Sequence, residues 1–437
     1  MIESIKKLIQ KKSSDQIIIT EKLQEYLDLL ENTNDNYFIT GKAGTGKTTL
    51  IDLFRKISKK KIVVLAPTGL AAINAKGQTI HSFFKFPPRM ISKDMVHQVY
   101  DRSLYSEVDT IIIDEASMLR ADMLDAIEVF MRLNGRDKNN PFGGAQIILV
   151  GDLFQLPPVV SSQEQDIYSS LYETPYFFSA GSFNQELFRV LLLDEVFRQK
   201  DQEFVELLNM IREGDASLKS LEIINKRTTN SNFEDDHIIL CPTNAAADGI
   251  NEIKLNAINS PVHKYEAVLE GSFVDNERYL PVSAVLKLKK GARVLFTKND
   301  MGGKWVNGSL GKVHSLEDDV VQIRLDSGQI VDVEMEKWSD IRYKYNEETR
   351  EIEEEEVGSA FQYPLKLAWA ITIHKSQGMT FDKVCLDFRK SPFAHGQTYV
   401  ALSRCRTLEG ITLTKNIYPN DLLVDTRIIE FYFNLKN

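Results

Sequence analysis

The first half of the chain alternates short apolar runs with amphipathic segments. The apolar runs are rich in Ile and Val, are bounded by Gly, Pro or Asp, and comprise Tyr37–Thr40, Ile62–Ala66, Thr110–Asp114 and Gln146–Val150. Such runs are typical of buried strands. Thr48–Ser58 and Asp122–Leu133, which lie between them, have helical character. Strands that alternate with helices predict an α/β domain, in which helices cover both faces of a parallel sheet.

A second set of apolar runs follows later in the chain. It comprises Val190–Leu193, His237–Cys241, Lys383–Phe388 and Ile411–Thr414. Residues Pro261–Tyr363 interrupt this set with short alternating runs punctuated by Gly and Asn. This alternation predicts a small antiparallel β-rich insertion inside a second α/β domain. We place the domains at 1–185, 186–260, 261–362 and 363–437, with a small insertion at about 80–105 in the first. Met1–Gln16 has the pattern of a short amphipathic helix.

Composition supports several domains and an intracellular protein. The chain has 437 residues, of which 43% are hydrophobic, and this length exceeds what one compact core organises. The three cysteines are far apart and have no zinc spacing, and we expect Cys241 and Cys385 to be buried on strands. No apolar run approaches the length of a membrane span, and the N-terminus lacks the features of a secretory signal. We therefore expect a cytoplasmic protein, associated with the nucleoid if bacterial, with no membrane partner.

A phosphate-binding loop follows the first apolar run. Residues Gly41 to Thr48 match the pattern G-x-x-x-x-G-K-[ST] between a strand and a helix. In this pattern glycines let the backbone wrap the phosphates, and amides at the helix N-terminus point at the anion. Lys47 would reach the β- and γ-phosphates, and Thr48 would hold Mg²⁺. The remaining predicted nucleotide contacts are Gly44, Thr45, Gly46 and Thr49.

Two acids end the third apolar run, at the edge of a parallel sheet where ligands bind. Asp114 would orient Mg²⁺, and Glu115 would polarise the attacking water as a general base. An Asp-Glu pair after a strand is by itself more often a helix N-terminus. Together with the phosphate loop, it predicts hydrolysis of a nucleoside triphosphate, with ATP and Mg²⁺ as cofactors.

Further motifs resemble those of superfamily 1 helicases. They are Gly151–Val159, Phe197–Gln199, Trp369–Thr380 and Tyr399–Thr407, in this order. Pro141–Gln146, together with Asp122, Leu124 and Asp125, resembles the signature of the Pif-type 5′-to-3′ DNA helicases. The resemblance spans about Thr20 to Thr414. It implies two RecA-like parallel-sheet domains, a wedge-like insertion in the first, and an SH3-like β-rich insertion in the second.

The resemblance also implies roles around ATP. Gln24 would read the adenine, because its amide both donates and accepts. Gln155 would sense the γ-phosphate, and Gly378 would lie at the nucleotide. Arg198 and Arg404 would be arginine fingers that bridge the transferring phosphoryl oxygens. Arg406 is a weaker substitute. ATP would then bind between two domains, and its hydrolysis would release a closed cleft.

A path for single-stranded DNA follows from the same resemblance. The expected contacts are Thr68, His81, Phe83, Pro157, Thr243, Asn244, His374, Lys375 and Ser376. Phe83 is a candidate stacking residue, although a Phe pair is more often part of a core. Lys298 and Asn307 are further candidate donors from the β-rich insertion. Most of these groups are neutral, which is typical of sequence-independent phosphate contacts.

The predicted function is an ATP-dependent 5′-to-3′ DNA helicase. It would translocate on single-stranded DNA, open forks, duplexes or G-quadruplexes, and be monomeric in solution. One alternative is a RecD-type translocase that works within a recombination or conjugation complex. Another is a single-strand binding module with a decayed ATP site, although Lys47, Thr48, Asp114 and Glu115 are all intact.

The charge distribution leads to a testable expectation. The net charge is −9, but Glu347–Glu356 alone carries −6 and is typical of a solvated loop or exposed hairpin. The rest of the chain is nearly neutral, and neutral donors displace few counterions. We therefore expect a shallow salt dependence of single-strand binding, which a titration of the dissociation constant against salt measures. A steep slope would contradict neutral contacts.

Overall fold

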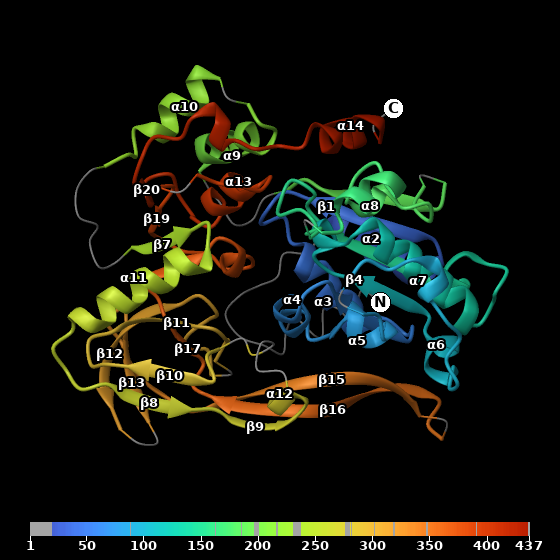
Figure 1. Cartoon of the computed structure of the whole chain (residues 1–437), viewed down its shortest axis with the longest axis horizontal. Helices are drawn as coiled ribbons and strands as arrows, with labels where there is room; N and C mark the ends of the chain where they lie inside the picture. The colour runs from blue at the N-terminus through green and yellow to red at the C-terminus, as the bar shows by residue number, and fades with distance from the viewer. Residues whose placement is uncertain are drawn as a thin grey trace.

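The computed structural model describes residues 20–435 except 88, 162, 185, 196–200, 216, 230–236, 276–279, 281, 301, 318–319, 347 and 390. The helix expected at Met1–Gln16 lies outside these residues. In Figure 1 the chain forms two α/β bodies, with a β-rich part beneath the second and a long hairpin running back toward the first.

The first body is built on a six-stranded parallel sheet with the order β3-β2-β4-β5-β1-β6. Its strands are β1 (Asn36–Gly41), β2 (Ile62–Ala66), β3 (Gln78–Thr79), β4 (Thr110–Ile113), β5 (Gln146–Gly151) and β6 (Phe188–Leu193). Successive side chains enter opposite cores: Phe38 faces one, while Tyr37 and Ile39 face the other. This alternation explains why the central strands read as continuous apolar runs.

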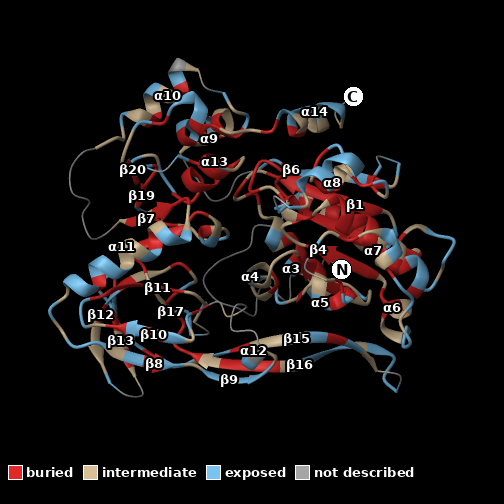
Figure 2. Cartoon of the chain, viewed as in Figure 1, coloured by how far each residue is buried: buried red, intermediate tan, exposed pale blue. Residues whose placement is uncertain are grey.

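Helices cover both faces of this sheet. They include α2 (Glu21–Asn32), α3 (Lys47–Ile57), α4 (Gly69–Asn74), α5 (Ile80–Phe84), α7 (Ala121–Asn134) and α8 (Gln165–Leu171). Leu27, Leu30, Leu50 and Phe54 of α2 and α3 pack with the Tyr37–Ile39 side in one core. The predicted parallel α/β domain is therefore confirmed, and red buried strands mark its centre in Figure 2.

One strand belongs to a different sheet from the one predicted. The run Val190–Leu193 was assigned to the second domain, but as part of β6 it pairs with β1, with Asn36 opposite Phe188 and Gly41 opposite Leu193. It is the edge strand of the first sheet and alternates buried with exposed residues. Apolar periodicity identifies a strand but not its neighbour, so the sequence could not assign it. The first sheet thus extends beyond the predicted border at 185, to Leu193.

The second body has a four-stranded parallel sheet with the order β18-β7-β19-β20. The strands are β7 (Ile238–Cys241), β18 (Ala370–Thr372), β19 (Val384–Leu386) and β20 (Ile411–Leu413). The helices around it are α9 (Gln202–Arg212), α10 (Leu218–Asn225), α11 (Asn244–Ala257) and α13 (Gln397–Leu402). Cys241 and Cys385 are buried free thiols on β7 and β19, as predicted.

The β-rich insertion separates β7 and α11 from β18. Its main sheet is antiparallel, with the order β14-β13-β12-β11-β17. These strands are β11 (Arg293–Phe296), β12 (Leu310–Leu316), β13 (Val321–Leu325), β14 (Ile330–Val333) and β17 (Leu365–Leu367). A small sheet of β8 (His263–Glu266) and β10 (Val285–Leu288) packs into the same core. Because β17 pairs with β11, the insertion ends beyond the predicted 362.

A long hairpin of β15 (Glu336–Asn346) and β16 (Glu351–Gln362) leaves the insertion, and β9 (Val268–Gly271) pairs with β16. It carries the Glu run, and residues 353–356 on β16 are exposed, which confirms the expected exposed hairpin. Its far end contacts the first body. The backbone N–H of Val64 donates to the hydroxyl of Tyr343 at 3.2 Å, and Arg55 forms an ion pair with Glu354 at 3.5 Å.

The C-terminal helix α14 (Thr426–Asn434) also crosses between the bodies. Residues 363–437 were assigned to the second domain, but α14 packs on the first, as Figure 1 shows. The ring of Phe431 stacks on Phe178 with centroids 4.5 Å apart, and Tyr432 stacks on Phe154 at 5.4 Å. The Tyr432 hydroxyl is 2.6 Å from the hydroxyl of Thr40 at the end of β1.

The signature at Pro141–Gln146 has a structural role. Phe142 is fully buried, and Gln146 donates through its amide nitrogen to the carbonyls of Thr33 and Asp35. Gly143 has a left-handed φ of 64°, and a side chain there would collide with the carbonyl of Met131 at the end of α7. These residues fix the entry of β5 against α7.

Two acids on α7 pin the segments around it. Asp122 binds Arg120 and accepts from the backbone N–H of Ile91 at 2.9 Å, which anchors the predicted wedge insertion. Asp125 accepts from the N–H of Ser182 at 2.8 Å. The residues that carry the resemblance thus have a packing role at this end of the sheet.

Gly143 offers a test of this packing. We expect Gly143→Ala to destabilise the protein by at least about 3 kcal/mol, because it adds both φ strain and a collision. Gly291→Ala is the matched control: its φ is 89° but its surroundings are open, so it should cost about 1 kcal/mol. Urea unfolding measures both. Equal losses would show that the collision with Met131 is relieved by movement.

Candidate functional site

The phosphate loop has the backbone conformation that its glycines were expected to provide. Gly44 and Gly46 have left-handed φ values of 82° and 83°. Gly46 precedes α3 and supplies no side-chain cap, so the first amides of α3 are open to an anion. Thr45, Thr48 and Thr49 line a cavity beside these amides.

Lys47 lies at the base of the loop. Its ammonium donates to the carbonyl oxygens of Gly41 at 2.7 Å and Lys42 at 2.9 Å. Burial lowers the pKa of Lys47, although the carboxylates of Asp152 and Glu115 oppose this shift. A polyphosphate would therefore meet a desolvated cation that it can stabilise in the charged form.

Two acids face Lys47 from the end of β4. Burial, with the neighbouring Asp114, raises the pKa of Glu115 to about 7. Burial also raises the pKa of Asp114, whose Oδ1 accepts from the backbone N–H of Glu115 at 2.9 Å. Glu115 has a left-handed φ of 53°, a strained conformation for this residue type. A carboxyl with a pKa near neutrality suits proton abstraction from water.

Residues of both bodies line one cavity of about 1120 Å³. The phosphate loop, Asp114, Glu115 and Gln155 contribute from the first body. Gly378 and Arg404 contribute from the second. The predicted nucleotide residues from both halves of the chain are therefore brought together, with the exception of Gln24 and of Arg198, which lies outside the described residues.

Gln24 does not line this cavity. Its amide nitrogen donates to Asp28 at 3.2 Å along the same helix. The cavity wall near it is formed by Thr20, Lys22 and Leu23 instead. The structure therefore does not support the predicted adenine contact in this conformation, because the amide is engaged within α2.

Arg404 is buried at the second body's side of the cavity. Its guanidinium donates to the carbonyl of Val400 at 2.9 Å and to the hydroxyl of Ser403 at 2.9 Å. It is 2% exposed, and its charge opposes the raised pKa of Glu115. Arg406 also lines the cavity, but it is exposed and paired with Asp382 at 3.0 Å. These positions favour Arg404 over Arg406 as the charge that faces the reacting phosphate.

Asp152 joins the two bodies beside the cavity. Its carboxylate accepts from Arg212 on α9 at 2.9 Å and from the hydroxyl of Tyr399 on α13 at 3.2 Å. The Tyr399 hydroxyl in turn accepts from the backbone N–H of Ala43 in the phosphate loop at 3.0 Å. Burial alone would raise the pKa of Asp152, but Arg212 and Lys47 hold it below its usual value.

Arg212 is also enclosed by aromatic rings. Its guanidinium lies 4.0 Å from the ring centre of Phe154 and 5.7 Å from that of Tyr432 on α14. The motif Gly151–Val159 contained Asp152, but sequence reasoning missed Arg212, Tyr399 and Tyr432. Tyr399 could have been singled out, since it is the first residue of the motif Tyr399–Thr407. Nothing in a single sequence pairs Arg212 with a carboxylate 60 residues earlier.

The predicted DNA contacts begin at strand ends on both bodies. Thr68 follows β2 and caps α4 by accepting from the N–H of Ala71 at 3.2 Å. Thr243 follows β7 and caps α11 in the same way, accepting from Ala246 at 3.4 Å. Each hydroxyl still has its own proton to donate. Asn244 is exposed next to Thr243, and Pro157 is partly exposed after β5.

His81 and Phe83, the next predicted DNA contacts, differ in whether their side chains are free to contact DNA. His81 is partly buried with an unpartnered Nδ1, and burial lowers its pKa. Phe83 is 3% exposed and packs edge-on against Phe84 and Tyr105, with Tyr343 also near. The prediction that Phe83 stacks on a base is therefore wrong for this conformation, because its ring is part of the core.

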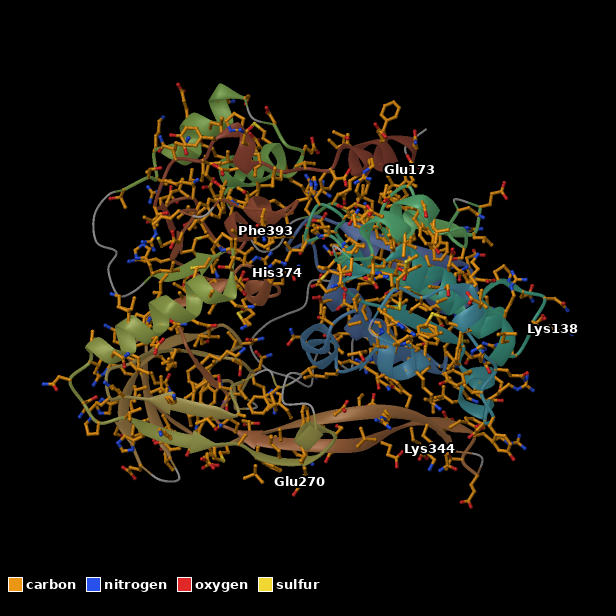
Figure 3. The ribbon with its side chains drawn as sticks, viewed as in Figure 1. Lys138, Glu173, Glu270, Lys344, His374 and Phe393 are labelled. Carbon is orange, nitrogen blue, oxygen red and sulfur yellow. The ribbon has the colours of Figure 1, made fainter. Side chains whose placement is uncertain are left out.

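Residues 374–376 form the 3₁₀ turn η6 (His374–Ser376) after β18. Figure 3 labels His374 on the side of the second body turned toward the first, and Lys375 is exposed. Ser376 is fully buried, and its hydroxyl donates to the carbonyl of Ile373 at 2.7 Å. Its side chain is therefore engaged within the turn and is not available to DNA. Lys298 is likewise engaged, in an ion pair with Glu336 at 2.9 Å.

The described part of the chain lacks two features. No helix there is long and apolar enough to cross a membrane. No group of three or more His, Cys, Asp or Glu residues gathers there as a metal site. A cation held by Thr48, Asp114 and phosphate oxygens would not require such a group.

Comparison with known proteins agrees with this geometry. Residues 12–222 match the model of the PIF1-like helicases. The chain is 32% identical to the ATP-dependent DNA helicase Pif1 of Bdellovibrio bacteriovorus, covering 93% of this chain and 90% of the relative. The chain belongs to the PIF1-like helicase family. As a member of that family it is an ATP-dependent DNA helicase.

Solved Pif1 structures extend the comparison. The Bacteroides Pif1 in complex with ADP-AlF4 is 39% identical, with a TM-score of 0.88 over 96% of this chain and 97% of that one. The same protein bound to single-stranded DNA is also 39% identical over 96% and 97%, but with a TM-score of 0.69. The arrangement of the parts here is therefore closer to that of the ADP-AlF4 complex, and of the unliganded protein with its TM-score of 0.87, than to that of the DNA complex. The predicted two-body α/β fold is confirmed.

The contact between Arg212 and Asp152 can be tested by unfolding. We expect Arg212→Met to lower the free energy of unfolding by about 3–5 kcal/mol, because it leaves a buried charge unpaired. Adding Asp152→Asn should recover part of this loss. Urea titration measures the effect.

The control is Arg189→Met, which removes an exposed pair with Asp35 and should cost no more than about 1 kcal/mol. If Arg212→Met were no more costly than this control, Asp152 would not depend on Arg212.

Proposed function

We propose that this Pif1-type helicase moves 5′ to 3′ along single-stranded DNA and opens duplexes, forks or G-quadruplexes. The observation that carries the proposal is one cavity lined by Lys47 and Glu115 of the first body and Arg404 of the second. Hydrolysis at such a site depends on the relative position of the two bodies, so it can be converted into their relative movement.

In this proposal, the residues of the cavity share the chemistry of ATP hydrolysis. Lys47 and the first amides of α3 bind the β- and γ-phosphates, and Gln155 senses the γ-phosphate. Glu115 takes the proton of the attacking water, for which its raised pKa is suited. Arg404, with Arg198 as a second finger, stabilises negative charge on the phosphoryl oxygens.

A magnesium ion fits the donors at the end of β4. The Thr48 hydroxyl and an Asp114 carboxylate oxygen are hard oxygen ligands at the edge where the phosphates would lie. When bound, Mg²⁺ neutralises phosphate charge. The cation would also favour the ionised form of Asp114, opposing the effect of burial.

The single strand would run along the carboxyl edges of the two parallel sheets. Thr68, His81 and Pro157 would contact it from the first body, and Thr243, Asn244, His374 and Lys375 from the second. This placement is supported by the matching strand ends and helix caps at Thr68 and Thr243. Closing and opening of the nucleotide cleft would change the spacing between the two sets of contacts.

Solved structures of similar proteins support DNA as the partner. One solved structure shows the Bacteroides Pif1 bound to single-stranded DNA. Another concerns the unwinding of forked duplex DNA by two coordinating Pif1 helicases. We propose the same two substrates here and a monomer as the free state. The RecD-type alternative gains no specific support from the structure, whereas the Pro141–Gln146 signature packs as an integral part of the first body.

The test compares ATP hydrolysis with and without single-stranded DNA. We expect strong stimulation in the natural chain. Lys47→Ala and Glu115→Gln should each lose at least about 100-fold of this activity while still binding single strands. Retained DNA-stimulated hydrolysis in Lys47→Ala would refute the assigned site.

Polarity requires a second assay. Forks that carry either a 5′ or a 3′ single-stranded tail are mixed with the purified chain, ATP and magnesium. We expect opening of the 5′-tailed substrate alone, with Glu115→Gln as the inactive control. Opening of only the 3′-tailed fork would overturn the direction, and hydrolysis without any opening would favour a translocase that needs a larger complex.

A further inference from the structure

Lys366 occupies an unusual position on β17. It lies opposite Leu295 of β11 in the antiparallel register. Its neighbours on the strand, Leu365 and Leu367, belong to the core of the β-rich insertion, whereas Leu295 belongs to the large core shared with the second body. Because side chains alternate along a strand, Lys366 points away from the insertion's core and toward the second body.

No carboxylate of the described residues neutralises Lys366. Among the described residues it has neither an ion pair nor a hydrogen bond from its ammonium group, and the charge that acts on it is another cation, Lys375. Burial, with this like charge, lowers the pKa of Lys366 to about 8. A half-buried lysine without an acidic partner is costly to the free protein, so an external anion is the partner that would suit it.

Two side chains in the neighbouring segments have unpartnered polar atoms. The Thr297 hydroxyl oxygen and the Gln377 side-chain nitrogen are buried without hydrogen bonds. Thr297 follows β11, and its backbone N–H donates to the carbonyl of Pro364, which places its side chain on the same face as Lys366. Gln377 lies two residues after Lys375, with the buried Ser376 between them.

The loop after Thr297 reaches the second body beside residues 375–380. A side chain at Gly308 would lie 3.6 Å from Met379 and 3.8 Å from the carbonyl of Thr380. The side-chain oxygen of Asn307 is also buried without a partner. The β-rich loop and residues 375–380 thus form two sides of one junction. None of Lys366, Thr297 and Gln377 lines the nucleotide cavity.

We propose that Lys366, Thr297 and Gln377 bind a backbone phosphate of single-stranded DNA at the junction between the β-rich insertion and the second α/β body. An ammonium, a hydroxyl and an amide are all donors, which matches a phosphodiester that only accepts hydrogen bonds. Lys375 adds a second positive charge. The proposal rests on the proposed function, since it names a contact of the single strand.

A bound phosphate would change the protonation of Lys366. Near pH 8.5 the free protein holds this side chain mostly neutral, and a phosphodiester favours the charged ammonium, so binding should take up a proton. Other nearby groups do not mimic this effect. Burial keeps the pKa of His374 below its usual value, so it stays neutral, and Lys298 is held by Glu336.

Calorimetry of the full chain tests the site. A short oligo-dT is titrated at about pH 8.5 in two buffers with different enthalpies of ionisation, which reports proton uptake on binding. We expect uptake in the natural chain. Lys366→Arg should bind but take up no proton, because arginine is always charged. Lys366→Met should bind about tenfold more weakly, also without uptake.

Lys298→Met is the matched control, and it should retain the uptake because Lys298 already has a partner. Uptake that persists in both Lys366 variants would overturn the proposal, as would unchanged affinity in Lys366→Met. Inorganic phosphate alone should produce no uptake; if it does, the site binds phosphate ions and not the DNA backbone. If the folded natural chain binds no oligo-dT at all, the proposed function fails instead.

Discussion

A buried carboxylate at the end of β5 holds together the parts of the molecule that must act as one. Asp152 cannot reach solvent, so its charge must be met by protein groups, and two side-chain donors come from the second body: Arg212 and Tyr399. Tyr399 also accepts from the phosphate loop. The contact that stabilises this charge therefore links the phosphate loop to the opposite wall of its cavity.

Other contacts across the two bodies surround this one. The C-terminal helix α14 lays Tyr432 beside Arg212 and Phe154, and the hairpin β15–β16 reaches β2 through Tyr343. Both begin in the second half of the chain and end on the first body. Movement of the bodies would therefore rearrange packed aromatic groups, and in the proposed function nucleotide chemistry at Lys47 and Glu115 would bias that rearrangement.

The sequence predicted what local patterns encode. The phosphate loop, the acids after β4, the two α/β bodies, the β-rich insertion and the exposed Glu run all follow from short motifs and periodicity. It failed where partners are distant: β6 pairs with β1, β17 with β11, and α14 with the first body. It also could not tell that Phe83 is core, because burial depends on the tertiary fold. The bonds of Ser376 to Ile373 and of Gln24 to Asp28 are local, but a family motif does not say which rotamer a side chain adopts.

The most direct test of the account is the distance between the two bodies during the nucleotide cycle. The three native cysteines are buried, so fluorophores can be placed at Leu133→Cys on α7 and Ile253→Cys on α11, both exposed, with Leu133→Cys and Ile167→Cys as a pair within the first body. With single-stranded DNA present, energy transfer between the first pair should differ between ADP-AlF4 and ADP, while the second pair stays constant. An unchanged distance in labelled protein that still hydrolyses ATP would contradict the claim that hydrolysis acts through this cleft.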